Sequence, residues 1–247
     1  MTHHSPETRH SPETTSSPAS SPTSDLLDQT LLAIEAFFTA LAETRPARDG
    51  LPADLDGLPA RLRDRYERLR ADQRHRAGDE PTRHHLAVSL AVLAAYRELS
   101  PELPDEELLP LLERTFVEPL RAGMLAGVAA ALDAAPDPFA LMVAYNRQRE
   151  RDYFGPAFTF SHPRDDDHEH VARVDHCYYH QVLEANGAGR LTPVLCAFDA
   201  NWSDAIDPER HGFAFERPTT IGHGGPHCPF TFRRTAAGAG QGEVTAR

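Results

Sequence analysis

The spacing of apolar residues changes near residue 155, and this change constrains the fold more than any other feature of the sequence. Between 24 and 152, apolar side chains recur at three- and four-residue intervals, as in Leu58, Leu62 and Tyr66, which is the spacing of amphipathic helices. Beyond residue 155, short segments rich in β-favouring residues replace this pattern. The sequence therefore predicts an α+β fold, in which a helical N-terminal half packs on a C-terminal α+β portion with a small antiparallel sheet.

Capping and composition signals divide the first half into several helices. Ser24 or Asp25 can cap the first helix. The alanine- and leucine-rich run 85–99 is typical of a buried helix, and the acidic residues 105–107 suit the first turn of the next helix. A further helix is predicted over 139–151.

The second half combines short strands with short helices. We predict a helix from Tyr178 to Ala185 that ends at Asn186-Gly187, and a second short helix or strand over 191–198. Residues that favour β-structure predict strand segments at 158–160, 171–174, 213–221 and 230–232. The glycine-rich turn 222–225 is expected to close the antiparallel element.

Composition divides the chain into four regions. Residues 1–24 repeat His-Ser-Pro-Glu-Thr and continue in a Ser/Pro/Thr-rich run, which predicts a disordered tail. A helical region at 25–152 and a motif-bearing α+β region at 153–234 follow, and we expect 25–234 to form one structural unit. The small and polar residues 235–247 predict a loose C-terminal tail.

Charge and composition exclude several classes of function. The chain of 247 residues has a net charge of −12 and no basic stripe, which argues against a nucleic-acid partner. It contains no lysine, so Schiff-base and P-loop lysine chemistry are excluded. No apolar run reaches bilayer length and the N-terminus lacks an apolar signal region, so we expect a cytoplasmic protein without a membrane partner. The apolar helical half could supply a homodimer interface.

All three cysteines lie in the C-terminal motif region, and each has polar residues nearby. Cys177 stands three residues before His180, Cys196 three before Asp199, and Cys228 follows the glycine-rich turn. Positions i and i+3 share one face of a helix, so the imidazole of His180 could lower the pKa of the Cys177 thiol or carry its proton. Thiols confined to one region predict chemistry or metal binding there.

Four ordered motifs extend this pattern, and they are Cys177-Tyr178-Tyr179-His180, Leu195-Cys196-x-x-Asp199-x-x-Trp202, Arg217-x-x-Thr220-Ile221 and Gly224-x-x-x-Cys228-x-Phe230-x-Phe232. Over roughly residues 139–234 the chain resembles the L-2-amino-thiazoline-4-carboxylic acid hydrolase family. The resemblance implies a hydrolase without a cofactor, acting on a small polar heterocycle. In the implied reaction, water adds to the ring carbon between sulfur and nitrogen, a cyclic amidine C–N bond opens, and a carbamoyl-cysteine product forms.

The same residues suggest a mechanism. The catalytic candidates are Cys177 as nucleophile, His180 as proton carrier, Asp199 as the partner of His180 or of a cationic amidine, and Cys228 beside the turn. Arg217 could hold a substrate carboxylate in a bidentate grip, and amides of the turn could stabilise negative charge. The other substrate-binding candidates belong to the same motifs and are Cys196, Trp202, Thr220, Gly224 and Gly225. Cys196 and Trp202 could instead be residues of the hydrophobic core, without a role in chemistry.

Two sets of residues could bind a metal ion instead. The first would be a Cys3His zinc site, made of Cys177, His180, Cys196 and Cys228. The second lies in a polar loop and consists of His162, Asp165–Asp167, His168 and His170. On a strand, His168 and His170 would face the same side, although a solvated charged loop is the preferred interpretation.

Pro229 follows Cys228 directly, at a position where the family usually has aspartate. The alternative function is therefore a non-catalytic module of the same fold that binds a small ligand or zinc. A divergent biosynthetic tailoring enzyme is a further alternative.

Overall fold

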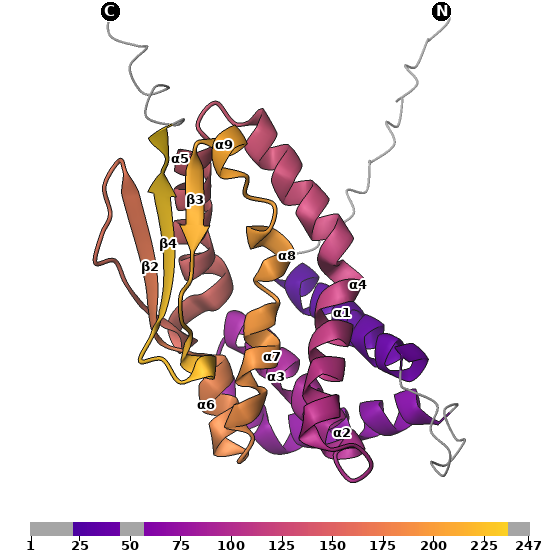
Figure 1. Cartoon of the computed structure of the whole chain (residues 1–247). Coiled ribbons are helices and arrows are strands. Elements are labelled where there is room, and N and C mark those ends of the chain that lie inside the picture. The colour runs from indigo at the N-terminus through magenta and orange to yellow at the C-terminus, as the bar shows by residue number, and fades with distance from the viewer. Residues whose placement is uncertain (1–21, 45–56, 237–247) are drawn as a thin grey trace, which may run out of the picture.

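The protein is described by a computed structural model over residues 22–44 and 57–236. The N-terminal half is helical (Figure 1), and its long helices are α1 (Pro22–Thr44), α2 (Leu58–Gln73), α3 (Glu80–Leu99), α4 (Asp105–Ala134) and α5 (Pro138–Arg149). A π-helical segment, η2 (Glu150–Phe154), continues α5 without a break.

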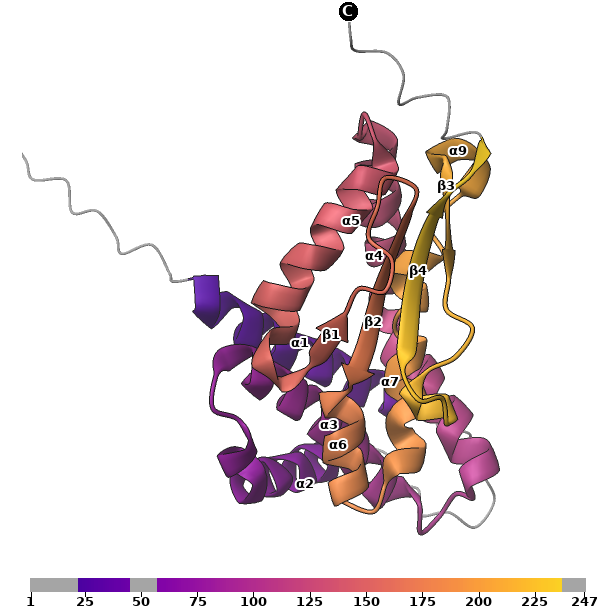
Figure 2. The same ribbon diagram turned by 90° about the vertical axis from the view of Figure 1, so that its left-hand side faces the viewer.

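The C-terminal half contributes a four-stranded antiparallel sheet with the order β1-β2-β4-β3. Its strands are β1 (Thr159–Ser161), β2 (Glu169–His176), β3 (Phe213–Glu216) and β4 (Cys228–Arg234). The short helices between β2 and β3 are α6 (Tyr178–Ala185), α7 (Thr192–Ala197), α8 (Ala200–Ser203) and α9 (Pro208–His211). Figure 1 shows the sheet on the left and α4 on the right, with α7 and α8 between them, and Figure 2 shows the sheet in front. This arrangement confirms the predicted α+β class.

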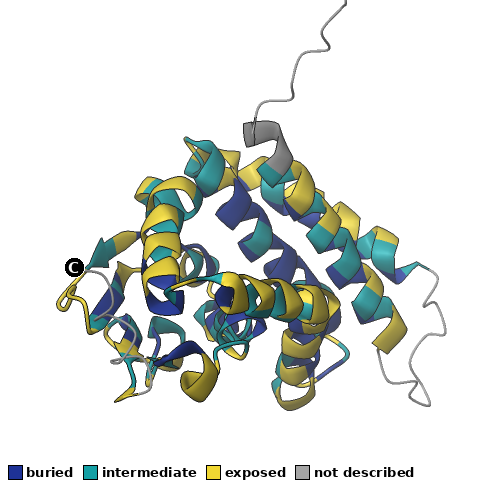
Figure 3. Ribbon diagram, turned by 90° about the horizontal axis from the view of Figure 1, so that it is seen from above, coloured by how far each residue is buried: buried dark blue, intermediate teal, exposed yellow. Residues whose placement is uncertain are grey.

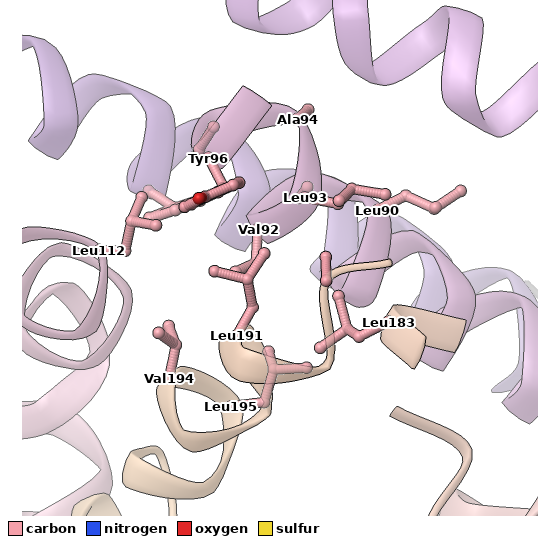
Figure 4. Packing of buried hydrophobic residues seen from close by; sticks show 14 of the residues in the cluster. Leu90, Val92, Leu93, Ala94, Tyr96, Leu112, Leu183, Leu191, Val194 and Leu195 are labelled. Atoms are coloured by element: carbon pink, nitrogen blue, oxygen red, sulfur yellow. The ribbon is translucent and has the colours of Figure 1, made fainter. Parts of the chain in front are cut away.

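The α3 helix lies at the centre of the helical half because its sequence is apolar on nearly every face. Asp79 caps its first turn by accepting a hydrogen bond from the Thr82 backbone N–H at 2.9 Å. Further along the helix, Val92 and Leu93 pack near Leu191 and Leu195 of the C-terminal half (Figure 4). One hydrophobic core therefore joins the helices to the motif-bearing region.

A second, aromatic cluster covers the other end of the sheet. Phe213 of β3 and Phe232 of β4 are fully buried, and they pack with Trp202 against Phe139 of α5 and Leu132 of α4. Viewed from above, buried segments lie on the inner faces of the helices and exposed segments on the outer faces (Figure 3). The sheet is thus fixed to both long helices that follow α3.

The segment 191–198, for which a short helix or a strand was predicted, is helical, as the end of η4 (Gly189–Leu191) and α7. Two element boundaries differ from the sequence prediction. The first helix begins at Pro22, so Ser24 and Asp25 lie inside it and do not precede it. Strand β3 ends at Glu216 and does not reach Ile221, because the Arg217 side chain turns to Asp199 and Pro218 has no N–H to donate to a sheet.

The α4 helix has the length and composition of a membrane span. Its most apolar window has a mean hydropathy of 1.2 and is 17% buried. The prediction that no apolar run reaches bilayer length was therefore wrong for this segment. Glu118, Pro119 and Arg121 interrupt the run in the sequence without lowering its average enough. Core helices of water-soluble proteins can have the same length and composition, so this property alone assigns no membrane partner.

Several sequence predictions fall wholly or largely outside the described residues. These are most of the disordered tail at 1–24 and most of the loose tail at 235–247.

Candidate active site

The three cysteines converge on one cavity of about 810 Å³. Cys177 immediately precedes α6, Cys196 lies in α7, and Cys228 begins β4. The cavity walls come from elements as far apart in the chain as α1 and β4. Residues that are distant in sequence therefore form a single site, as the grouping of the motifs predicted.

Cys177 occupies the N-cap position of α6, where the helix presents unpaired backbone N–H groups. Burial raises the pKa of its thiol to about 12, although backbone N–H groups of His180 and Tyr179 oppose the rise. The imidazole of His180 is not the group that reaches the sulfur, because its Nδ1 lies 3.0 Å from Thr192 Oγ1. The predicted thiol–imidazole pair is therefore replaced by a thiol at a helix N-terminus.

The other two thiols contact the η5 turn (Ile221–His223). The Ile221 backbone N–H donates to Cys228 Sγ at 3.1 Å, and the Gly222 N–H is directed at the Cys196 thiol. A Cβ atom at Gly222 would lie 2.9 Å from Cys196 Sγ, so glycine is required there. Burial raises the pKa of Cys228 to about 11 and also raises that of Cys196. The turn amides thus face sulfur atoms.

A partly buried ion pair stands beside the thiols. Asp199 accepts hydrogen bonds from Trp202 Nε1 at 3.1 Å and from Arg217 Nη1. Arg217 also donates to the Cys196 carbonyl at 3.1 Å and lies over the Phe230 ring. Burial raises the pKa of Asp199, and the Arg217 guanidinium opposes this rise. Because Arg217 is committed to Asp199, it is not the free carboxylate clamp that the sequence predicted.

Four predicted site residues lie outside the cavity lining, and they are His180, Thr220, Gly224 and Gly225. Thr220 is buried and hydrogen-bonds the His223 ring at 2.8 Å, so it shapes the turn. The Gly224 and Gly225 amides donate to Ile221 and Thr220 carbonyls inside the turn. They are therefore not available as the predicted oxyanion-binding donors.

Sequence reasoning missed a buried network of histidines and tyrosines in the cavity wall. His84 hydrogen-bonds Tyr153 Oη at 2.7 Å through Nε2 and Thr30 through Nδ1. His85 bonds Tyr179 Oη at 2.7 Å and the Tyr153 carbonyl at 2.8 Å. In the sequence, the sign of this network is a pair of adjacent histidines, His84 and His85, directly before a largely apolar run.

This network predicts a loss of stability in acid. Burial lowers the pKa of His84 to about 4 and holds that of His85 well below its usual range. Both rings are neutral when folded, so stability is full above pH ~6.5, the unfolded value, and falls as the pH drops toward 4. For His84 the loss reaches about 3 kcal/mol at pH 4. The free energy of unfolding of His84→Gln, measured with urea, should change less between pH 7.5 and 4.5 than that of the wild-type protein.

The exposed His75 provides the control for this experiment. His75→Gln should keep the pH dependence of the wild-type protein. Equal dependence in His84→Gln and wild-type protein would contradict the assignment of a neutral buried ring.

Arg149 is a second cavity residue that the motifs did not indicate. Its guanidinium lies 4.6 Å from the centre of the Tyr153 ring and 5.2 Å from that of Phe154. No carboxylate within residues 22–44 and 57–236 forms an ion pair with it. Because it is a cavity cation without an acidic partner there, it can bind an anionic group of a ligand.

The four residues of the Cys3His zinc set are not assembled as ligands. Within the part of the chain that the structure describes, ligand atoms of three metal-binding side chains come within 4.8 Å of one another at Glu150, His162 and His170. In the Cys3His set, the His180 Nδ1 is hydrogen-bonded to Thr192 Oγ1. The thiols share a cavity without the convergence that tetrahedral zinc requires.

Fold and site together define an α+β protein built around a large cavity that is lined by three thiols and a partly buried Asp–Arg pair. The sequence model of the family described as L-2-amino-thiazoline-4-carboxylic acid hydrolase matches residues 83–232, and the chain belongs to this family. The match confirms the resemblance seen over 139–234 and extends it through α3 and α4. No curated protein and no solved structure matches the chain.

Proposed function

We propose that the cavity hydrolyses a C–N bond of a small cyclic amidine that carries a carboxylate, such as 2-amino-thiazoline-4-carboxylate. The observation that carries this proposal is the presence of three thiols, the Asp199–Arg217 pair and Arg149 in one cavity of about 810 Å³. The family's name, which is that of a hydrolase, supports the reaction class.

The charges of the cavity suit such a substrate. Arg149 supplies the cation for the carboxylate, and Asp199 supplies a buried carboxylate for the amidine end. Aromatic walls that include Phe160, Trp202 and Phe230 can exclude water from the ring. The substrate is therefore held with its carboxylate at Arg149 and its amidine N–H groups at Asp199.

Cys177 is the proposed nucleophile. Because its pKa is raised, the thiol binds substrate in the neutral form and passes its proton to a nitrogen of the neutral amidine. This step makes the ring carbon more electrophilic and creates a thiolate at the α6 N-terminus, where the Tyr179 and His180 amides stabilise it.

The remaining steps complete a balanced hydrolysis. The Cys177 sulfur bonds to the ring carbon and the bond from that carbon to the ring nitrogen breaks. The ring nitrogen carries the proton from the thiol and leaves as an amine with a second proton from the exocyclic nitrogen. Water then adds to the same carbon, which keeps its exocyclic nitrogen, and the thiol departs with its proton restored. The product is an open-chain carbamoyl compound.

The test compares two substrates that differ only in the carboxylate. Wild-type protein should open the ring of 2-amino-thiazoline-4-carboxylate with a much lower KM than that of 2-aminothiazoline. Arg149→Met should raise the first KM by about 10- to 100-fold, the loss expected for one charged hydrogen-bonded contact, and leave the second nearly unchanged. Ring opening is followed by chromatography and mass spectrometry of the product.

Arg151→Met is the matched control, because Arg151 is exposed, lies two residues after Arg149 at the start of η2 and does not line the cavity. It should behave like wild-type protein with both substrates. Failure of wild-type protein to open any cyclic amidine would overturn the proposed function.

A non-catalytic ligand-binding role is the second candidate. It is favoured by the raised pKa of all three thiols, which keeps them in the unreactive form at neutral pH. In that case, calorimetry would detect binding of the carboxylate substrate that Arg149→Met weakens, with no turnover.

A further inference from the structure

His170, on β2, has one ring nitrogen without a hydrogen-bond partner in the described part of the chain. The ring is fully buried, and its Nδ1 lies 2.9 Å from the Asp165 carboxylate. A carboxylate accepts, so Nδ1 carries the proton and Nε2 presents a lone pair. No group in the described part of the chain donates to this Nε2. A buried acceptor without a partner is costly and indicates that a ligand belongs there.

Two further metal-binding side chains stand next to this ring. The His162 ring stacks on the His170 ring, with 5.5 Å between their centres, and its Nε2 lies 3.0 Å from Glu150 Oε1. One ligand atom from each of His162, His170 and Glu150 lies within 4.8 Å of the others. Two bonds of about 2.0–2.1 Å at a tetrahedral angle place ligand atoms about 3.3 Å apart. Small side-chain movements would therefore complete a site.

We propose that Glu150, His162 and His170 bind one divalent transition-metal ion of the zinc type. Two imidazoles and one carboxylate form a ligand set that suits zinc and iron(II) and not magnesium or calcium, which prefer oxygen. Asp165 is the outer partner that fixes the tautomer of His170, and Arg147 pairs with Asp165 in turn. This site is separate from the three thiols, and the proposal does not depend on the proposed hydrolysis.

The position of Glu150 gives the site a connection to the cavity. It is the first residue of the π-helix η2, a type of segment that is frequent at functional sites, and it lines the cavity wall. Three protein ligands leave at least one position of a tetrahedral ion open. The ion would therefore lie at the cavity wall with one coordination position open to water or a ligand.

The test measures binding of Co²⁺ and Zn²⁺ to the full-length chain. His3, His4 and His10 are first replaced by alanine, so that the N-terminal histidines cannot supply a separate site. We expect one equivalent of Co²⁺ to give visible d–d bands without the near-ultraviolet charge-transfer band of thiolate ligation. Equimolar Zn²⁺ should remove these bands, whereas excess Mg²⁺ should not.

Variants of the ligands provide the decisive comparison. His162→Ala and Glu150→Gln should each raise the Kd for Co²⁺ by at least ~100-fold, and Asp165→Asn should raise it about 10- to 100-fold. His168→Ala is the matched control, because His168 is an exposed histidine of the same loop, and its Kd should not change. Since His162 is exposed, its replacement should leave the circular dichroism spectrum unchanged.

Two results would overturn the proposal. The first is no Co²⁺ binding by the background protein, and the second is a Kd that His162→Ala and Glu150→Gln leave unchanged. A thiolate charge-transfer band would instead assign the ion to the cysteines. None of these readouts uses enzyme activity, so failure of the metal site and failure of the proposed hydrolysis are distinguishable.

Discussion

Replacing Cys177 with alanine is expected to reduce kcat for ring opening of 2-amino-thiazoline-4-carboxylate by about 10³-fold or more. The reason is that Cys177 alone among the three thiols stands at the N-terminus of a helix, where two backbone N–H groups can stabilise a thiolate. The loss should appear in kcat and not in KM, because a small thiol contributes little to substrate binding. Steady-state kinetics with both substrates measure this split.

Cys196→Ala is the matched control, since it also replaces one cavity thiol with a hydrogen atom. It should reduce kcat far less than Cys177→Ala. Full turnover in Cys177→Ala, or an equal loss in both variants, would remove Cys177 as the nucleophile. Mass spectrometry of wild-type protein quenched during turnover should also detect a covalent adduct on the peptide that contains Cys177.

Replacing Arg217 with methionine is expected to destabilise the fold by about 2 kcal/mol, because it removes the cation beside the partly buried Asp199 carboxylate. Methionine retains most of the apolar stem that packs near Phe230. The double variant Asp199→Asn/Arg217→Met should be more stable than Arg217→Met alone, since it removes the orphaned charge. Urea unfolding at pH 7.5 gives all the free energies of this cycle.

Arg70→Met tests whether any loss of arginine has such an effect. Arg70 and Glu67 form a solvent-exposed pair three residues apart in α2, so this change should cost at most about 0.5 kcal/mol. If Arg217→Met were as mild as Arg70→Met, Asp199 would not depend on Arg217 for its charge. The role of this pair as the amidine-binding end of the cavity would then need revision.

The fold class followed from the sequence because its signals are local. Helical periodicity and capping depend on neighbours within four residues, and α2, α3 and α6 form where those patterns lie. The strand at 213–221 was predicted too long because its end is set by a distant contact. Arg217 leaves the sheet to meet Asp199, and no local pattern records that contact.

Several residues that line the candidate site could be predicted from the sequence, whereas the orientations of their side chains could not. Grouping of the cysteine motifs placed all three thiols in one site, and the cavity contains them. The direction of the His180 ring was not predictable, because it depends on Thr192 twelve residues later. Arg149 belongs to no motif. Its place in the cavity wall and its lack of an acidic partner in the described chain are visible only in the structure.

The same limit applies to the histidines. His84 lines the cavity and His85 lies buried behind it, and both take part in one network only because η2 brings the Tyr153 hydroxyl and carbonyl to them. His170 was considered in a charged loop, but its full burial follows from its place on β2. Spacing along the chain shows which side chains could meet, whereas burial decides which of them need a partner.

The cavity takes its walls from both ends of the described chain. Thr30 and Ile34 of α1 face it, as do Cys228 and Phe230 of β4. No fragment that lacks either end contains the whole site, so its formation coincides with cooperative folding and not with any local element. A ligand held there therefore opposes unfolding of the entire molecule by mass action. In a heated extract, resistance of this chain to precipitation becomes a direct search tool for its natural ligand, without knowledge of the reaction.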